Sequence, residues 1–128
     1  MPATYRIDSS RRLVEQFMSG KVEFAEALTM LARMRQDPLF DPKFDVIVDA
    51  SGMSATDISF QAISQAASSG ALNPFSKESR CAVVAPGELA YGMARMYEAV
   101  RRGGEYEIFR SISEAQAWLV GRSKAEAS

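Results

Sequence analysis

Carboxylates, hydroxyls and lysines are the reactive side chains of this chain, because it contains no histidine and a single cysteine, Cys81. Without histidine, neither a Ser-His-Asp triad nor an imidazole acid or base near neutral pH can form. One cysteine excludes an intramolecular disulfide and a structural zinc site, and an apolar run after it predicts a buried, inert thiol. A carboxylate-based hydrolase would need a second acid or base beside Asp49, and the sequence places none there. We therefore expect a binding protein rather than an enzyme.

The segment from Asp49 to Ser54, Asp-Ala-Ser-Gly-Met-Ser, holds the polar side chains best placed to bind a ligand. It follows a run of β-branched residues and precedes a predicted helix, and open α/β sheets place ligands at such a strand end. A helix N-terminus there would favour an anion, including a phosphorylated serine. Asp49 and Gly52 are therefore candidate contacts to an anion or a partner. The structural alternative is that Ser54 or Thr56 caps the helix and Gly52 makes the turn.

Four aspartates recur every four residues, at Asp37, Asp41, Asp45 and Asp49. Two of them precede proline, which is typical of turns, and their spacing matches no metal-binding loop. We therefore expect neither a metal site nor another cofactor.

The charge balance bears on the partner and the compartment. Fifteen basic and sixteen acidic residues give a net charge of −1, without the basic excess that is typical of nucleic-acid-binding domains. The first residues lack the apolar segment of a signal peptide, and no apolar run is long enough to span a bilayer. We expect a soluble, cytoplasmic protein that binds no nucleic acid and spans no membrane.

The 128 residues fit one domain, which we expect over residues 1–121, followed by a flexible tail at 122–128. Hydrophobic spacing predicts the order β-β-α-β-α-β-α-β-α. A helix is the alternative for the second strand, at 11–18. Crossovers make the later strands parallel, so the predicted fold class is α/β with a mixed sheet flanked by helices. The predicted elements lie at about 4–8, 11–18, 23–35, 45–49, 57–69, 81–85, 89–102, 106–109 and 112–121.

Two predicted helices carry apolar side chains that could line a cavity. Phe60 and Ile63 lie on the first of these helices, and Met93 and Tyr97 lie on the second. Methionine and aromatic positions of this kind more often fill a core than bind a ligand. If a cavity exists, these four residues would line it. Arg95, on the polar face of the second helix, is a further candidate contact to an anion or partner, although most such arginines are only solvated.

Taken with this element order, three segments resemble the SpoIIAA-like, STAS-related family, whose STAS domains occur in anti-sigma-factor antagonists and in the tails of sulfate transporters. The resemblance covers nearly the whole chain, including the helix that ends at Asp37-Pro38 and the strand that ends at Asp49. The segments are Arg80-Cys-Ala-Val-Val-Ala, Tyr91-Gly-Met-Ala-Arg-Met-Tyr97 and Ile108-Phe-Arg-Ser-Ile-Ser-Glu-Ala-Gln-Ala-Trp-Leu119.

This resemblance implies a non-enzymatic module of bacterial signalling that binds a protein partner, such as a serine kinase or another regulator. In the antagonists a switch serine lies in an Asp-Ser-Ser-Gly-like turn at the start of the helix after the third strand. The matching turn here is Asp-Ala-Ser-Gly, which makes Ser51 the nearest candidate for phosphorylation and Ser54 the second. A homodimer through an exposed face is a further expectation. A lipid-binding branch shares this fold class and implies the alternative, a carrier or sensor of a small apolar or lipid ligand.

Overall fold

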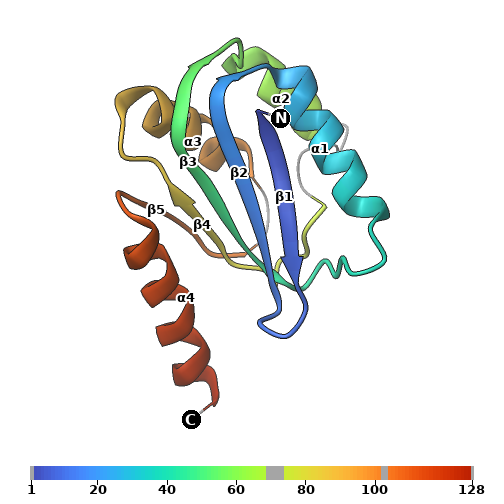
Figure 1. Cartoon of the computed structure of the whole chain (residues 1–128), viewed down its shortest axis with the longest axis vertical. Coiled ribbons are helices and arrows are strands. Elements are labelled where there is room, and N and C mark those ends of the chain that lie inside the picture. The colour runs from blue at the N-terminus through green and yellow to red at the C-terminus, as the bar shows by residue number, and fades with distance from the viewer. Residues whose placement is uncertain (1, 69–73, 102–103, 128) are drawn as a thin grey trace.

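The structure is a computed structural model that describes residues 2–68, 74–101 and 104–127, with the backbone alone described for residues 122–127. Within these residues the elements follow one another in the predicted order (Figure 1). They are β1 (Ala3–Asp8), β2 (Leu13–Val22), α1 (Phe24–Gln36), β3 (Asp45–Thr56), α2 (Phe60–Ser68), β4 (Cys81–Val84), α3 (Glu88–Val100), β5 (Tyr106–Phe109) and α4 (Ile112–Ala127).

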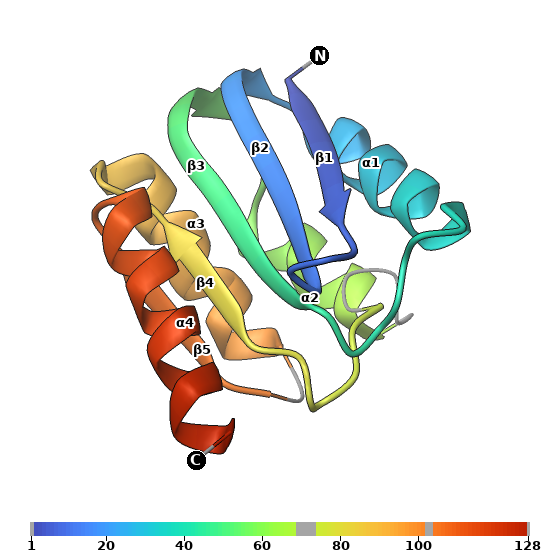
Figure 2. The same cartoon turned by 60° about the horizontal axis from the view of Figure 1, so that its bottom comes forward.

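The five strands form one sheet in the order β1-β2-β3-β4-β5. The β1–β2 pair is antiparallel, and each later pair is parallel. Helices α1, α2 and α3 cover one face of the sheet, and α4 packs on the other face over β3, β4 and β5 (Figures 1 and 2). The predicted mixed α/β architecture is therefore confirmed.

Alternating side chains along the central strands build two hydrophobic cores, one on each face of the sheet. Val46 and Val48 of β3 belong to the larger core, under α1, α2 and α3, whereas Ile47 belongs to the smaller core, under α4. Cys81 and Ala82 of β4 are divided between the two cores in the same way. A strand that is buried on both faces needs an unbroken apolar run, which is the pattern of both strands.

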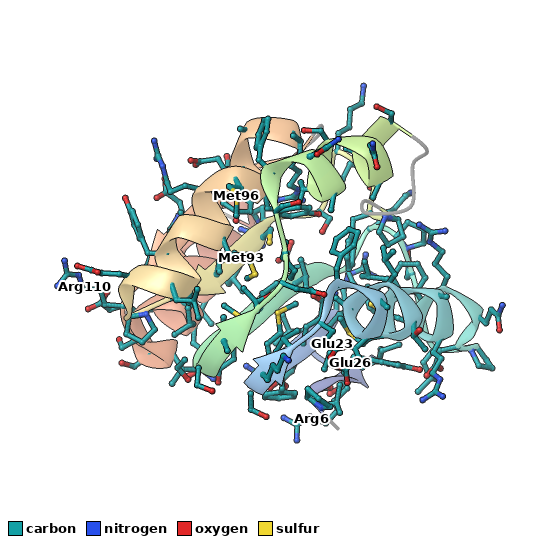
Figure 3. All side chains as sticks on the ribbon, turned by 90° about the horizontal axis from the view of Figure 1, so that it is seen from above. Arg6, Glu23, Glu26, Met93, Met96 and Arg110 are labelled. Atoms are coloured by element: carbon teal, nitrogen blue, oxygen red, sulfur yellow. The ribbon has the colours of Figure 1, made fainter. Side chains whose placement is uncertain are left out.

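Helix α1 owes its position to an apolar stripe and to residues that mark its two ends. Its buried face contains Ala27, Met30, Leu31 and Met34. At its start the backbone N–H of Glu23 donates to the Glu26 carboxylate at 3.2 Å, as in a capping box (Figure 3). It ends before Asp37-Pro38, as predicted, because the residue before a proline avoids helical geometry.

The second strand is longer than predicted, and the helix considered for residues 11–18 is wrong. Gly20 does not end β2, which continues to Val22. Gly20 adopts a positive φ of 65°, and the pairing with β3 shifts register on either side of it. A glycine tolerates this φ, so the strand bends at a bulge and continues.

The third strand is also longer than predicted, which moves the Asp49–Ser54 segment. Residues 45–56 all belong to β3, so the loop predicted after Asp49 is wrong. The extension is held by pairing with the second half of β2, which a local pattern does not reveal. Helix α2 consequently begins at Phe60, and its cap is Ser59, whose Oγ accepts a hydrogen bond from Ala62 N at 3.1 Å.

Helix α4 begins as predicted but continues further. Glu114 N donates to Ser111 Oγ at 3.3 Å, and Ala115 and Leu119 are buried in the smaller core. Ile112, the first residue of the helix, is 39% exposed. Residues 122–127 continue the helix beyond the predicted end at residue 121. The flexibility of segment 122–128 stays a prediction.

Candidate functional site

A cavity of about 90 Å³ lies inside the larger core, between the sheet and the helices α1, α2 and α3. Its walls come from every strand except β1 and from the loops before α2 and β4. Most of its lining is aliphatic, aromatic or thioether. This apolar part includes Met18, Phe24, Met30, Leu31, Ile58, Ile63 and Met93.

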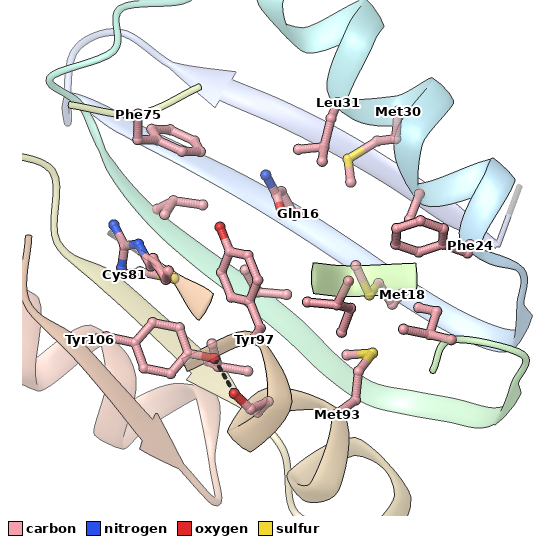
Figure 4. A pocket seen from close by; sticks show the side chains of 18 residues that line it. Gln16, Met18, Phe24, Met30, Leu31, Phe75, Cys81, Met93, Tyr97 and Tyr106 are labelled. Carbon is pink, nitrogen blue, oxygen red and sulfur yellow. Dashed lines mark hydrogen bonds between the residues drawn. The ribbon is translucent and has the colours of Figure 1, made fainter. Parts of the chain in front are cut away.

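The polar side chains of the lining are Gln16, Cys81, Tyr97, Arg101 and Tyr106, and they come from β2, β4, α3, the residue after α3, and β5. In Figure 4, Cys81, Tyr97 and Tyr106 lie toward one end of the cavity, and Gln16 lies nearer its middle. Methionines and Phe24 occupy the other end. One end of the cavity is therefore more polar, and the other end is apolar.

Gln16 is a polar side chain on the buried face of β2. It is only 5% exposed. Its Nε2 donates a hydrogen bond to Met34 Sδ at 3.5 Å, and its side chain makes no other hydrogen bond to the described residues. A thioether is a weak acceptor, so most of the hydrogen-bonding capacity of this amide faces the cavity.

Arg101 brings a positive charge to the same end. Its guanidinium lies 5.6 Å from the centre of the Tyr106 ring. Nη1 donates to the carbonyl of Glu105 at 3.3 Å, and Nη2 donates to the carbonyl of Ser79 at 3.4 Å. Its Nε is buried and has no hydrogen-bond partner within the described ranges. Two long bonds to carbonyls leave the charge without a neutralising carboxylate in that part of the chain.

The acidic groups of the cavity are neutral at physiological pH. Burial raises the pKa of the Cys81 thiol to about 11, and it also raises the pKa of the Tyr97 and Tyr106 hydroxyls. The positive charge of Arg101 lowers these pKa values, but burial outweighs it. Arg101 is thus the charged residue of the described lining. A buried neutral thiol is a poor nucleophile.

Three of the four side chains predicted to line a cavity, Ile63, Met93 and Tyr97, lie in its wall. Phe60 lies outside the lining and is 53% exposed, because it occupies the first position of α2. The prediction for Phe60 is wrong.

The sequence predictions did not include Gln16 or Arg101, although the spacing of side chains in the sequence marks both positions. Gln16 interrupts the apolar alternation between Val14 and Met18 on β2. Arg101 continues the four-residue spacing of Met93 and Tyr97, so it extends the inner face of α3 rather than its polar face.

The candidate switch residues lie on the other side of the sheet. Side chains alternate along β3, so Ala50 faces the larger core and its neighbours Asp49 and Ser51 face away from it. Asp49 Oδ1 accepts hydrogen bonds from Ser51 N at 3.0 Å and from Ser51 Oγ at 2.6 Å. Ser51 and Ser54 are exposed within the strand, so the expectation of a helix N-terminus beside them is wrong.

Gly52 and Arg95 are separate from this pair and from each other. Gly52 pairs with Ser19 in the sheet, and a Cβ at Gly52 would lie 3.2 Å from the Ser19 Cβ. Arg95 is exposed on α3, where its Nη1 lies 2.9 Å from Glu98 Oε1. The structure therefore does not bring the five predicted anion-contact and switch residues into one site.

No cluster of three or more acidic or cysteine side chains in the described ranges could hold a metal ion. None of the described helices is long and apolar enough to cross a membrane.

Comparison with known proteins identifies the fold. No protein-family model matches the chain, and no curated protein matches it. A solved structure does match, an uncharacterized protein of the DUF3478 family from Shewanella loihica PV-4 that is described as having a SpoIIAA-like fold. The two share 19% sequence identity and a TM-score of 0.60 over 91% of this chain and 93% of that one. The chain therefore has a SpoIIAA-like fold, as the sequence resemblance implied.

Proposed function

We propose that this protein is a non-enzymatic binding module that carries or senses a small apolar ligand inside the larger core. The observation that supports this function best is the cavity of about 90 Å³ between the sheet and α1, α2 and α3. Protein interiors are normally packed with few voids larger than a water molecule. A larger apolar space with a few polar groups at one end is the usual form of a ligand site.

The volume of the cavity limits the ligand. An engineered apolar cavity of roughly 150 Å³ takes up benzene, whereas pockets for drug-sized molecules measure about 300–1,000 Å³. At about 90 Å³, this cavity suits a short chain better than a ring or a long-chain lipid. A lipid would need the helices to move apart.

The test is native mass spectrometry of freshly purified protein, followed by thermal-shift screening of short apolar molecules. We expect a copurified or added small ligand to bind the wild type. Ala94 lines the cavity, so Ala94→Leu should abolish binding by filling it. Ala99 is exposed on the same helix, so Ala99→Leu is the matched control and should bind as the wild type does. Equal ligand binding by the two variants would contradict the proposal.

A second candidate function is regulation through a protein partner, with Ser51 as the phosphorylation site. The observation that favours it is exposure: Ser51 lies on the strand surface that faces away from the larger core. A phosphate on Ser51 would replace the 2.6 Å hydrogen bond to Asp49 with repulsion between two anions. Phosphorylation would therefore change the charge and shape of this surface, to which a partner or a second copy of the chain would bind.

This candidate is tested by incubation with serine kinases and mass spectrometry of the product, with Ser51→Ala and Ser54→Ala as controls. Light scattering before and after modification reports a change in assembly. If no kinase modifies either serine, the switch is excluded.

A further inference from the structure

The cavity contains one feature that an apolar ligand alone does not explain, which is a charged group in its wall. Arg101 is the residue directly after α3, and it lines the cavity together with Tyr97 and Tyr106. Arg101 is half-buried, so water reaches part of it, but the side of the guanidinium beside the apolar space is costly to bury unless an anion or several hydrogen bonds compensate it. Among the described residues, only two backbone carbonyls accept hydrogen bonds from the Arg101 side chain, and no carboxylate pairs with it.

The hydrogen bonds of Arg101 show how much of its capacity is unused. A guanidinium has five N–H donors in a planar fork that fits a carboxylate. Here two nitrogens make bonds of 3.3 and 3.4 Å to backbone carbonyls, and Nε is buried with no partner among the described residues. A carbonyl oxygen carries only a partial charge, so the site lacks an anion.

The Gln16 amide is a second, independent group of this kind. It comes from β2, on a different element from Arg101, and its only side-chain hydrogen bond to the described residues is a weak one to Met34. In Figure 4 the Gln16 amide and the Tyr97 hydroxyl point toward the same part of the cavity. The Tyr106 hydroxyl donates to Ala94 O at 2.8 Å.

We propose that the ligand is the anion of a short-chain carboxylic acid, with its carboxylate at Arg101 and Gln16 and its chain among the methionines and Phe24. This inference rests on the proposed function and specifies the ligand class. A guanidinium donor and an amide N–H donor can each serve one carboxylate oxygen. The apolar end of the cavity, including Met18 and Met93, then shields the chain from water.

The charge of the site favours a carboxylate over a phosphate. A phosphate monoester carries close to two negative charges at neutral pH, and Arg101 is the single charged residue of the described lining. A monoanion is neutralised by one arginine. If benzene's six carbons need roughly 150 Å³, the present volume of about 90 Å³ accommodates a chain of roughly four carbons, such as the butyl chain of pentanoate.

Isothermal titration calorimetry of the wild-type protein with pentanoate and with pentan-1-ol tests the inference, because the two ligands share a chain and differ in charge. We expect pentanoate to bind about ten- to a hundredfold more tightly, the size of effect that charge-assisted hydrogen bonds produce. Pentyl phosphate is the third ligand, and tighter binding of it than of pentanoate would overturn the choice of carboxylate.

Variants then locate the carboxylate. Arg101→Gln should reduce pentanoate affinity to the level of pentan-1-ol while leaving pentan-1-ol affinity unchanged. Arg110→Gln is the matched control and should keep the preference, because Arg110 is exposed beyond β5 and does not line the cavity. Figure 3 shows Arg110 away from Met93, which does line it. Arg101→Lys keeps the charge and should retain part of the preference. If Arg101→Gln does not fold, Arg101→Lys and the wild-type comparison of the ligands still decide.

The outcomes separate this inference from the proposed function. Equal affinities for pentanoate and pentan-1-ol, unchanged by Arg101→Gln, would overturn the carboxylate and leave an apolar binding site. Binding of neither ligand would also overturn the inference. The proposed function is then judged separately by native mass spectrometry and by the comparison of Ala94→Leu with Ala99→Leu.

Discussion

At the scale of single residues, the pair formed by Asp45 and Arg80 joins the starts of the two central strands. Arg80 Nη2 lies 2.5 Å from Asp45 Oδ2, and Arg80 N donates to Asp45 Oδ1 at 3.0 Å. The side chains are only 10% and 18% exposed. Asp45, which the sequence offers as one of four regularly spaced aspartates, therefore has a structural role.

We predict that Asp45→Asn lowers the free energy of unfolding by about 3 kcal/mol, because it leaves a mostly buried guanidinium without its carboxylate. Urea denaturation at neutral pH measures the loss. The control is Glu78→Gln, which removes an exposed ion pair with Lys43 at 3.9 Å and should cost less than about 1 kcal/mol. Equal losses for the two variants would contradict this assignment.

The buried thiol of Cys81 makes stability depend on alkaline pH. Its pKa is about 11 in the folded protein, against 9.0 for an unperturbed thiol. Below pH 9.0 the thiol is neutral in both states and this contribution to stability is complete. As the pH rises from 9.0 to about 11, only the unfolded state ionises, so stability is lost.

We therefore predict that the free energy of unfolding declines as the pH rises above 9.0, and that urea denaturation at a series of pH values shows it. Burial raises the pKa of Tyr97 and Tyr106 as well, which adds a loss in the same direction at higher pH. Cys81→Ala should make the first part of the decline shallower. An unchanged slope in Cys81→Ala would show that the thiol is not the titrating group.

At the scale of elements, Gly104 sets the distance between the segment that leads into β5 and the loop before β4. A Cβ at Gly104 would overlap the carbonyl oxygen of Ser79 and lie 2.6 Å from that of Lys77. Both obstacles are backbone atoms, which cannot turn aside as a flexible side chain can. This contact holds the Ser79 carbonyl in the place where Arg101 binds it.

We predict that Gly104→Ala destabilises the protein by at least about 2 kcal/mol through this overlap. Gly92→Ala is the matched control, because Gly92 is exposed within α3 and a Cβ there meets no atom within 4 Å. Alanine in a helix interior should stabilise the protein by about 0.5–1 kcal/mol relative to glycine. Thermal denaturation of the two variants should therefore shift in opposite directions.

Element identity followed from local pattern, whereas element length did not. The helix of residues 24–36 and the strand at 81–84 lie close to their predictions, because each has a clear apolar period and a turn signal at its ends. The extensions of β2 and β3 stabilise each other by pairing across a gap of about thirty residues in sequence. This long-range pairing places Ser51 in a strand rather than at a helix N-terminus.

At the scale of the whole molecule, the cavity determines whether the larger core can take a larger side chain without loss of stability. If the space is dry in solution, filling it adds apolar contact without displacing neighbours. We predict that Ala94→Leu changes the free energy of unfolding by less than about 1 kcal/mol or raises it, whereas overpacking a filled core costs about 1–3 kcal/mol. Chemical denaturation compared with Ala99→Leu provides the measurement. A large loss in Ala94→Leu alone would mean that the core closes around this position.

The sequence by itself determined the α/β class, the order of the elements and the mixed sheet, because these follow from local periodicity, turn residues and the geometry of crossovers. It also identified Ile63, Met93 and Tyr97 as inward-facing side chains. Only the tertiary structure decided that a space remains between them and that Gln16 and Arg101 reach it. The physical reason is that a cavity is a difference between the volumes of side chains from many elements, and no single segment encodes that difference.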